Sequence, residues 1–361
     1  MNDTKPIRQG EELNTENLAE FLRENLEVKT DEIVIEQFPA GSSNLTYCVK
    51  IGADEYVLRR PPFGNQVKSA HDMAREFNVL SKLSEVYKPA PKPLIYCNDE
   101  NVIGSEFYLM ERRNGLIIRG KSPTSEPSAA ADGLTLENSQ DLRKKVVESF
   151  IENLVELHSL DYKKIGLENL GKPEGYAERQ VTGWTKRYFN AKTDDQTELE
   201  KSIEWLNNHI PESHGASLIH NDYKFDNVML NPKDLTEIVA VLDWEMTTIG
   251  EPLMDLGSSL AYWMSKDAGA ELLSMPFNPR VLMENISRAE LVEMYEEKSG
   301  KKVSDIVFYY VFGTFKLAVI AQQIYFRFHQ GFTQDKRFAT FNHFVNALGK
   351  IALHTIQTER I

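Results

Sequence analysis

Short apolar runs separated by turn residues fill the first third of the chain. Three of these runs are rich in β-branched and aromatic residues, and they lie at 33–40, 45–52 and 55–62. Such runs are typical of antiparallel strands joined by turns. Residues 69–83 instead repeat apolar side chains at helical spacing, with Met73, Phe77 and Leu80 on one face. A further strand is expected over 107–115, so the pattern predicts an antiparallel sheet with one helix.

Beyond Arg112 the apolar residues recur mainly at helical spacing, as in 141–160 and 196–210. Between these regimes, residues 121–133 are small, polar and proline-bearing, and we expect a mobile loop there. Residues 306–326 are apolar for most of their length and could be mistaken for a membrane span. Lys316 lies near the centre of that run, which is costly in hydrocarbon. We therefore expect a buried helix and no membrane association.

Composition narrows the classes of protein that fit. The 361 residues suffice for two lobes, and contents of 41% hydrophobic and 26% charged residues are ordinary for a soluble protein. A net charge of −13 argues against nucleic-acid binding, which needs basic surfaces. The polar N-terminus and two cysteines without CxxC spacing indicate neither secretion, a disulfide framework nor a structural zinc site. A cytoplasmic location is expected.

The stretch "HNDYKFDNVML", residues 220–230, concentrates polar side chains between two strand-like runs at 217–220 and 237–244. Its spacing, His-x-Asp followed by four residues and Asn, is that of the protein-kinase catalytic loop. In that chemistry Asp222 accepts the proton of an attacking hydroxyl, Lys224 neutralises phosphoryl charge and Asn227 ligates Mg²⁺. Asp243, at the end of the following strand, supplies the carboxylate for the metal. Taken singly, these residues also fit a hydrogen-bonded turn and a helix cap.

"HNDYKFDNVML", "VLDWE" and "GEPLMDLG" together resemble the aminoglycoside phosphotransferase-like kinases, also called the choline kinase-like group. "YVLRRPP", "AREFNVLSKL" and "GYAERQVTGW" resemble, more specifically, the kinase-like domain associated with acyl-CoA dehydrogenases. The resemblance covers about residues 30 to 350. It implies an α+β, protein-kinase-like fold with a small antiparallel-sheet lobe at 1–112, which binds nucleotide. A larger, mainly helical catalytic and substrate lobe would follow at 113–361, with ATP and Mg²⁺ between the lobes.

Other positions match the family residue by residue. Glu76 stands where a helix glutamate pairs with a strand lysine that orients the phosphates, but the strand residue here is Arg59. Arginine can pair bidentately with Glu76, although an ordinary surface ion pair is the alternative. The turn 39–44 would cover the phosphates, and Asp255 would brace the catalytic loop unless it is an exposed first-turn residue. The remaining nucleotide-binding candidates are Ser42 and Ser43 in that turn, and Glu111 and Arg112 at the hinge, where the backbone would meet adenine.

The acceptor is expected to be a small molecule. Asp255 follows Asp243 by only 12 positions and no A-P-E follows, so the activation segment that seats a peptide in protein kinases is missing. The closer resemblance implies a hydroxyacyl-CoA, with an apolar wall and basic groups for the phosphates of the coenzyme. The wall residues would be Phe308, Tyr309, Phe312 and Phe315, with Lys316, Gln323, Arg327, Trp184 and Arg187 as candidate contacts. An aminoglycoside or other amino-alcohol acceptor, and a non-catalytic pseudokinase, stay open, as do GTP as donor and the oligomeric state.

Overall fold

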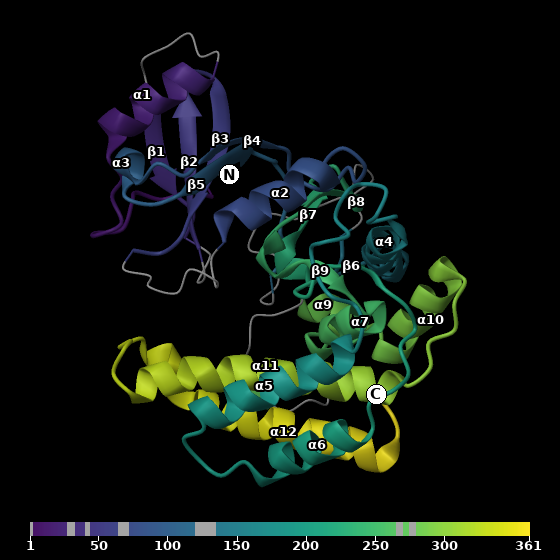
Figure 1. Ribbon diagram of the computed structural model, residues 1–361. Helices are drawn as coiled ribbons and strands as arrows, with labels where there is room; N and C mark the ends of the chain where they lie inside the picture. The colour runs from purple at the N-terminus through teal and green to yellow at the C-terminus, as the bar shows by residue number, and fades with distance from the viewer. Residues whose placement is uncertain are drawn as a thin grey trace. The chain divides into compact units, whose positions relative to one another are not determined.

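The computed structural model describes residues 3–26, 33–39, 44–63, 72–119, 135–264, 270–273 and 279–361 (Figure 1). Two of the nucleotide-binding candidates, Ser42 and Ser43, and the loop expected at 121–133 lie outside these residues. The chain forms two compact units. The first contains Met1–Asn114 and Val239–Glu245, and the second contains Gly115–Ile238 and Met246–Ile361.

The first unit is built on a five-stranded antiparallel sheet with the order β1-β2-β3-β5-β4. Its strands are β1 Ile33–Gln37, β2 Leu45–Ile51, β3 Asp54–Arg60, β4 Pro93–Cys97 and β5 Phe107–Glu111. Its helices are α1 Thr15–Asn25, α2 Met73–Leu83 and α3 Glu100–Ile103. The core lies between α1 and the sheet, where Leu18, Leu22, Tyr47 and Phe107 are fully buried. The expected sheet with an embedded helix is therefore confirmed.

Local chemistry explains the limits of α2 and of two unexpected elements, α1 and β4. The α2 helix begins at Met73, four residues later than the periodicity predicted, because the Asp72 side chain caps it by accepting from the Arg75 N–H at 2.8 Å. The α1 helix lies in a polar segment with few apolar residues, and an Asn14 cap fixes its start. The β4 strand opens on Pro93 and has no clear alternation of apolar and polar residues.

One segment of the C-terminal half belongs to the first unit. The β8 strand, Asp234–Val241, ends there, and the Val241 N–H donates to the Pro89 carbonyl at 2.8 Å. Trp244 then packs edge-on against Tyr87, with ring centroids 5.9 Å apart. A single division at Arg112 does not describe this path, because the chain returns to the first unit at Val239–Glu245.

The second unit is mainly helical. Its helices are α4 Gln140–Ser159, α5 Tyr176–Ala191, α6 Thr197–Asn208, α7 Pro252–Ala261, α8 Ala270–Leu273, α9 Arg280–Met283, α10 Arg288–Ser299, α11 Ile306–His329 and α12 Phe341–Thr358. Short strands β6 Ser217–Ile219 and β9 Thr248–Gly250 pair with each other, and β7 Val228–Asn231 pairs with β8. Among the described residues, the 3₁₀ turns η1 Phe225–Asn227 and η3 Lys336–Thr340 also lie in this unit, whereas η2 Trp244–Met246 begins in the first unit.

The α11 helix is the central helix of this unit and packs on α5, α6, α7 and α12 (Figure 1). By length and composition it is the one helix among the described residues that could cross a membrane, but 78% of its most apolar window is buried. It meets α7 backbone to backbone, since a Cβ added at Gly313 would lie 2.2 Å from the Gly257 carbonyl oxygen. The expected buried helix is therefore present.

Candidate active site

The three residues predicted to be catalytic come together in the second unit, on the loop between β6 and β7. The Asp222 carboxylate accepts from Lys224 Nζ at 2.5 Å and from Asn227 Nδ2 at 2.9 Å, both at Oδ2. Tyr262 donates its hydroxyl to Oδ1 at 3.1 Å. The side chain of Asp222 remains 17% exposed. These contacts fix the orientation of the carboxylate while leaving a path to it.

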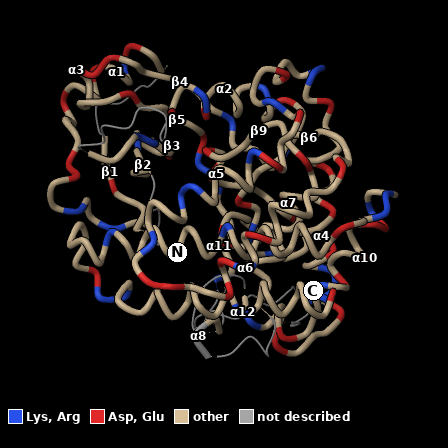
Figure 2. The backbone as a smooth tube through the Cα atoms, turned by 60° about the horizontal axis from the view of Figure 1, so that its bottom comes forward, with Lys and Arg blue, Asp and Glu red and all other residues tan. Residues whose placement is uncertain are grey.

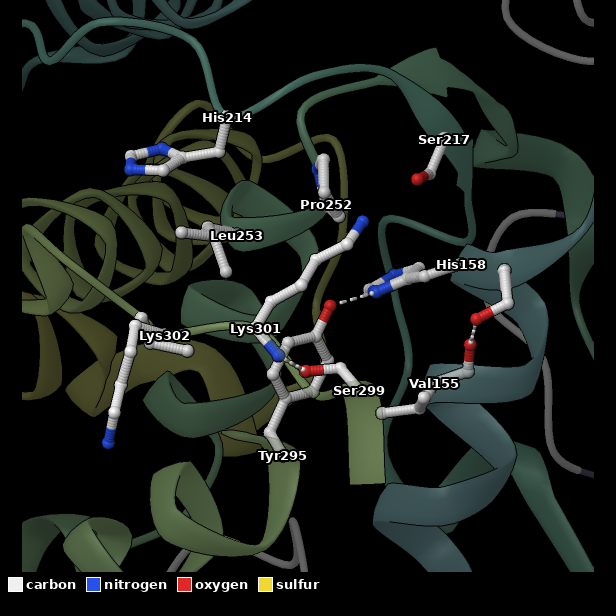
Figure 3. A pocket seen from close by; sticks show the side chains of 12 residues that line it. Val155, His158, His214, Ser217, Pro252, Leu253, Tyr295, Ser299, Lys301 and Lys302 are labelled. Carbon is white, nitrogen blue, oxygen red and sulfur yellow. Dashed lines mark hydrogen bonds between the residues drawn. The ribbon is translucent and has the colours of Figure 1, made fainter. Parts of the chain in front are cut away.

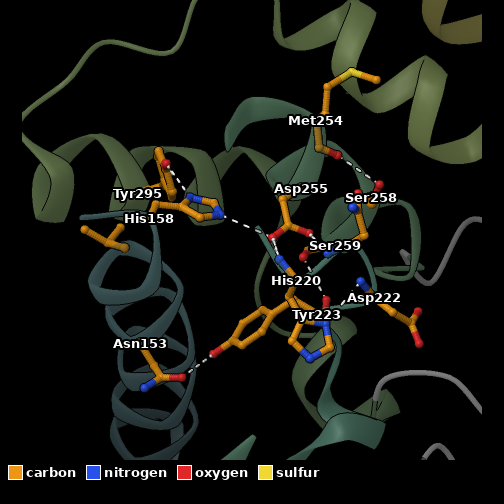
Figure 4. Close-up of polar contacts among 12 residues, drawn as sticks. Asn153, His158, His220, Asp222, Tyr223, Met254, Asp255, Ser258, Ser259 and Tyr295 are labelled. Atoms are coloured by element: carbon orange, nitrogen blue, oxygen red, sulfur yellow. Dashed lines mark hydrogen bonds and ion pairs between the residues drawn. The ribbon is translucent and has the colours of Figure 1, made fainter. Parts of the chain in front are cut away.

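Asp255 on α7 binds this loop through its carboxylate, as expected (Figure 4). Its Oδ2 accepts from the His220 N–H at 2.7 Å, and its Oδ1 accepts from the Asn221 N–H at 2.8 Å. Oδ2 also lies 3.2 Å from His158 Nε2. Asp255 is fully buried, so the alternative of an exposed first-turn residue is wrong. Burial alone would raise the pKa of Asp255, but the hydrogen bonds from His158 and His220 outweigh burial and lower it.

The two histidines around Asp255 have structural contacts. An ionised carboxylate can only accept, so Nε2 of His158 carries the proton, and its Nδ1 faces the Tyr295 hydroxyl at 2.9 Å. His220 is fully buried, and its Nδ1 accepts from the Asp222 N–H at 3.2 Å. Its ring packs edge-on against Tyr223. These contacts show that the His220 ring packs within the loop and supports its backbone.

A pocket opens on the other side of His158 (Figure 3). It is lined by α4, the start of α7 and the end of α10, including Val155, His158 and Tyr295. Lys301 extends its side chain toward Pro252 in this view. None of the residues predicted to be catalytic lines it, so this pocket is separate from the Asp222 side of the loop.

In the first unit, Arg59 on β3 joins carboxylates from two segments. Its Nη1 contacts Glu76 Oε1 on α2 at 3.0 Å, and its Nη2 contacts Asp243 Oδ1 at 3.0 Å. Glu245 follows at 3.8 Å from Nη2. The expected Arg59–Glu76 pair is present, but the guanidinium bridges two carboxylates instead of gripping Glu76 bidentately. The side chains of Arg59 and Glu76 are 10% and 2% exposed, so this is no ordinary surface ion pair.

The electrostatics of this cluster keep Arg59 charged. Burial alone would lower the pKa of Arg59, but Glu76, Asp243 and Glu245 raise it well above the ordinary arginine value. Burial raises the pKa of Glu76, and Arg59 opposes this shift. A buried guanidinium beside these carboxylates provides a fixed positive charge in the first unit.

The residues predicted to hold Mg²⁺ have the chemistry that this ion requires. Asp243 offers a carboxylate with 34% side-chain exposure, in a left-handed conformation (φ 69) that aspartate tolerates better than most residues. Asn227 donates its amide nitrogen to Asp222, which leaves the amide oxygen as its hard donor atom. The described residues contain no group of three or more His, Cys, Asp or Glu residues suited to a metal. A Mg²⁺ ion needs only a small number of protein ligands, because substrate phosphates and water complete its coordination shell.

The side chains of the two hinge candidates are engaged within the first unit. Arg112 pairs with Glu55 and with Asp3, each at 2.6 Å. Glu111 accepts from the Lys92 N–H at 2.7 Å. These contacts occupy both side chains within the first unit, and the backbone contact with adenine stays a prediction.

On the acceptor side, the expected aromatic wall is wrong. Phe308, Tyr309, Phe312 and Phe315 are at most 2% exposed and form the core of the second unit. Because these four rings are packed inside the unit, they cannot also line an open channel.

Lys316 contacts the backbone of the catalytic loop. Its Nζ donates to the Asn221 carbonyl at 2.6 Å and lies 5.7 Å from the Trp184 ring centroid. Arg187 stacks on the same ring at 4.5 Å. The predicted contacts Trp184, Arg187 and Lys316 therefore lie together, whereas Arg327 is exposed 11 positions further along α11, about 16 Å along the helix axis.

Sequence reasoning missed Tyr262 and His158, which complete the contacts around Asp222 and Asp255. Tyr262 is the C-cap residue of α7 and follows Asp255 by seven positions, a helical spacing that places both on one side of the helix. That spacing was a usable signal. His158 comes from α4, far away in sequence, and no local pattern indicates its partner.

Comparisons with known proteins agree with this geometry. Residues 34–275 match the sequence profile of the phosphotransferase enzyme family. A human relative, acyl-CoA dehydrogenase family member 11, is 34% identical over 332 residues. That match covers 89% of this chain but only 40% of the relative, so the chain spans about two fifths of the relative's length.

Solved structures share the fold. A candidate aminoglycoside phosphotransferase from Ralstonia eutropha has a TM-score of 0.78 and 26% identity, covering 96% of this chain and 99% of its own. Choline kinase from Cryptosporidium parvum has a TM-score of 0.62 and 14% identity, covering 96% of each chain. A thermostable mutant of aminoglycoside phosphotransferase APH(4)-Ia, in a complex with AMP-PNP and hygromycin B, has a TM-score of 0.58 and 14% identity, covering 94% of this chain and 98% of its own. The expected α+β, kinase-like fold is confirmed, and the chain belongs to the phosphotransferase enzyme family.

Proposed function

We propose that the protein is an ATP- and Mg²⁺-dependent kinase that phosphorylates a hydroxyl group of a small molecule. The carrying observation is the Asp222 carboxylate, held by Lys224, Asn227 and Tyr262 on a loop that the buried Asp255 braces. In the transfer, the acceptor oxygen forms a bond to the γ-phosphorus, and the bond from that phosphorus to the β–γ bridging oxygen breaks. The hydroxyl proton passes to Asp222, and ADP leaves.

The residues of the loop divide this work. Asp222 accepts the proton, and its two oxygens are oriented by donors on either side. Lys224 Nζ sits at the same carboxylate and supplies positive charge beside the transferring group. Because Asp255 binds the backbone N–H groups of His220 and Asn221, the loop needs little reorganisation before reaction.

The nucleotide side of the proposal rests on Arg59 and Asp243. Arg59 would contact the phosphates of ATP while staying paired with Glu76. Asp243 and Asn227 are the residues that would hold Mg²⁺, which when bound neutralises phosphate charge. The related-fold phosphotransferase that carries AMP-PNP supports ATP as the donor.

For the acceptor we propose a hydroxyacyl-CoA. Acidic and basic residues are interspersed along the chain (Figure 2), and its net charge is −13, so an anionic acceptor needs a local group of cations. Lys316 and Arg187 form such a group around Trp184, and the charge of Arg187 acts on Lys316. A polycationic antibiotic would be repelled there. The human relative named for acyl-CoA dehydrogenases supports the same choice.

The shape of α11 also suits an elongated acceptor. One face of this helix becomes more exposed away from the catalytic loop, from the buried Lys316 through the half-buried Ile320 and Ile324 to the exposed Arg327. These positions follow helical spacing and lie on one stripe. The stripe offers apolar contact and a distant cation, replacing the buried aromatic wall expected from the sequence.

ATP consumption measured with different acceptors tests the proposal. Hydroxyacyl-CoA thioesters with the hydroxyl at successive carbons should stimulate ADP formation, and the matching acyl-CoA without a hydroxyl should not. Kanamycin should give no stimulation. Stimulation of ADP formation by kanamycin and not by the thioesters would refute a hydroxyacyl-CoA as the acceptor. If the acyl-CoA that lacks a hydroxyl stimulated ADP formation equally, transfer to a hydroxyl would be refuted.

A further inference from the structure

Asn221, the residue directly before Asp222, is held at each of its polar groups. It adopts a left-handed conformation with φ 66, which is uncommon outside glycine. Its N–H donates to Asp255 and its side-chain Nδ2 donates to the Met246 carbonyl at 3.0 Å. Tyr176 donates its hydroxyl to Oδ1 at 3.2 Å. The backbone carbonyl accepts from Lys316, so four separate segments fix this one residue.

The carbonyl contact has a direct effect on the peptide that leads into Asp222. The Asn221 carbonyl and the Asp222 N–H belong to one planar peptide unit. That N–H donates to His220 Nδ1 at 3.2 Å, while Lys316 Nζ approaches the carbonyl end at 2.6 Å. The plane of this peptide sets the direction in which the Asp222 side chain leaves the backbone. Lys316 therefore fixes the end of the peptide that Asp255 does not reach.

Lys316 is buried and yet close to the acceptor side. It is 5% exposed, lies near the Trp184 ring, and feels the charges of Asp222, Lys224 and Arg187. A buried lysine is costly unless its ammonium group makes a specific contact, and here that contact is a backbone carbonyl of the catalytic loop. The cost of burying this lysine, together with its bond to the catalytic loop, indicates that Lys316 serves the function of the loop.

We propose that Lys316 is a positioning residue for Asp222, acting through its hydrogen bond to the Asn221 carbonyl. This inference rests on the proposed function, in which Asp222 accepts the proton of the acceptor. Loss of the bond would let the peptide tilt and would misplace the carboxylate, which lowers turnover without weakening ATP binding.

The test compares three variants of the full chain. Lys316→Met keeps the length of the side chain and removes the donor, Lys316→Arg retains a charged donor, and Gln322→Met is the matched control. Gln322 is a fully buried polar residue of the same helix whose Nε2 donates to the Ala191 carbonyl at 2.8 Å, away from the loop. Hydrogen exchange followed by mass spectrometry reports on residues 217–227, and steady-state kinetics report on kcat and on KM for ATP.

We expect Lys316→Met to speed exchange in 217–227 and to lower kcat by about 10- to 100-fold with KM for ATP unchanged. Lys316→Arg should recover at least part of the loss, and Gln322→Met should alter neither the exchange of the loop nor kcat. Unchanged exchange of the loop, or full turnover in Lys316→Met, would overturn the proposal. Hydrogen exchange can be measured without turnover. A protein without kinase activity would therefore refute the proposed function, and the exchange of residues 217–227 would still test whether Lys316 holds the loop.

Discussion

Replacing Asp255 with asparagine changes one oxygen to an NH₂ group in a fully buried site. Oδ1 accepts one hydrogen bond, from Asn221, whereas Oδ2 accepts from His220 and His158. The best orientation keeps the amide oxygen at the Oδ2 position, so the Asn221 N–H faces a second donor. A buried donor without a partner costs about 1–3 kcal/mol, and the two surviving bonds lose about 1 kcal/mol each with the carboxylate charge. The expected loss is about 3–5 kcal/mol.

Urea unfolding followed by tryptophan fluorescence measures this loss as a lower midpoint. Such a loss is a large share of the 5–15 kcal/mol typical of a folded domain. Asp195→Asn is the matched control, because that side chain is 93% exposed and pairs only with Lys192 among the ion pairs of the described residues. The control should change stability by less than about 0.5 kcal/mol. A loss below about 1 kcal/mol in Asp255→Asn would refute the view that this carboxylate holds the loop.

The pH dependence of the same difference gives a second check. The pKa of Asp255 is lowered in the folded protein, so its contribution is fully present above the ordinary aspartate pKa. The contribution is lost as pH falls through the lowered folded value. The gap in stability between the wild-type protein and Asp255→Asn should therefore be constant near neutral pH and shrink only in strongly acidic solution.

Further predictions concern the catalytic, metal, nucleotide and buried-lysine positions. Asp222→Asn should retain fold and ATP binding but lose on the order of 10²-fold or more in kcat. Asp243→Ala should weaken Mg²⁺-dependent ATP binding in calorimetric titrations; an unchanged Mg²⁺ dependence would make Asp243 structural. Arg59→Ala should raise KM for ATP, whereas Arg60→Ala should mainly lower stability, because Arg60 is 2% exposed, donates to the Ile103 carbonyl and stacks on Phe63. Burial lowers the pKa of Lys316 from 10.5 to about 8. As pH rises from about 8 to about 10.5, the free energy of unfolding of the wild-type protein should therefore increase by about 3 kcal/mol relative to that of Lys316→Met, measured by urea unfolding.

The sequence was most informative where structure and chemistry are local. The strands β2 and β3 follow from short β-branched runs, and the catalytic residues Asp222, Lys224 and Asn227 lie within one loop. Their spacing alone brings them together, because a tight loop leaves few conformations. The Arg59–Glu76 pair was predictable from family resemblance, but the bridge to Asp243 required the chain to return to the first unit.

Contacts between distant segments were not predictable in the same way. His158 reaches Asp255 from α4, and Lys316 reaches Asn221 from α11, with nothing in the local pattern to indicate either partner. Phe312 and its aromatic neighbours were misread for a related reason. A run of aromatic residues has the same composition whether it fills a core or lines a channel, and only the packing of α7 and α12 around α11 decides between them.

Mass spectrometry of the acceptor after incubation with ATP and Mg²⁺ tests the central claim most directly. The wild-type protein should convert a hydroxyacyl-CoA to a product heavier by one phosphoryl group, at the hydroxyl and with one ADP formed for each product. Asp222→Asn, folded and still binding ATP, should form this product at least about 10²-fold more slowly. A phosphorylated product formed equally fast by Asp222→Asn, or ADP released by the wild-type protein with no phosphorylated acceptor, would contradict the account.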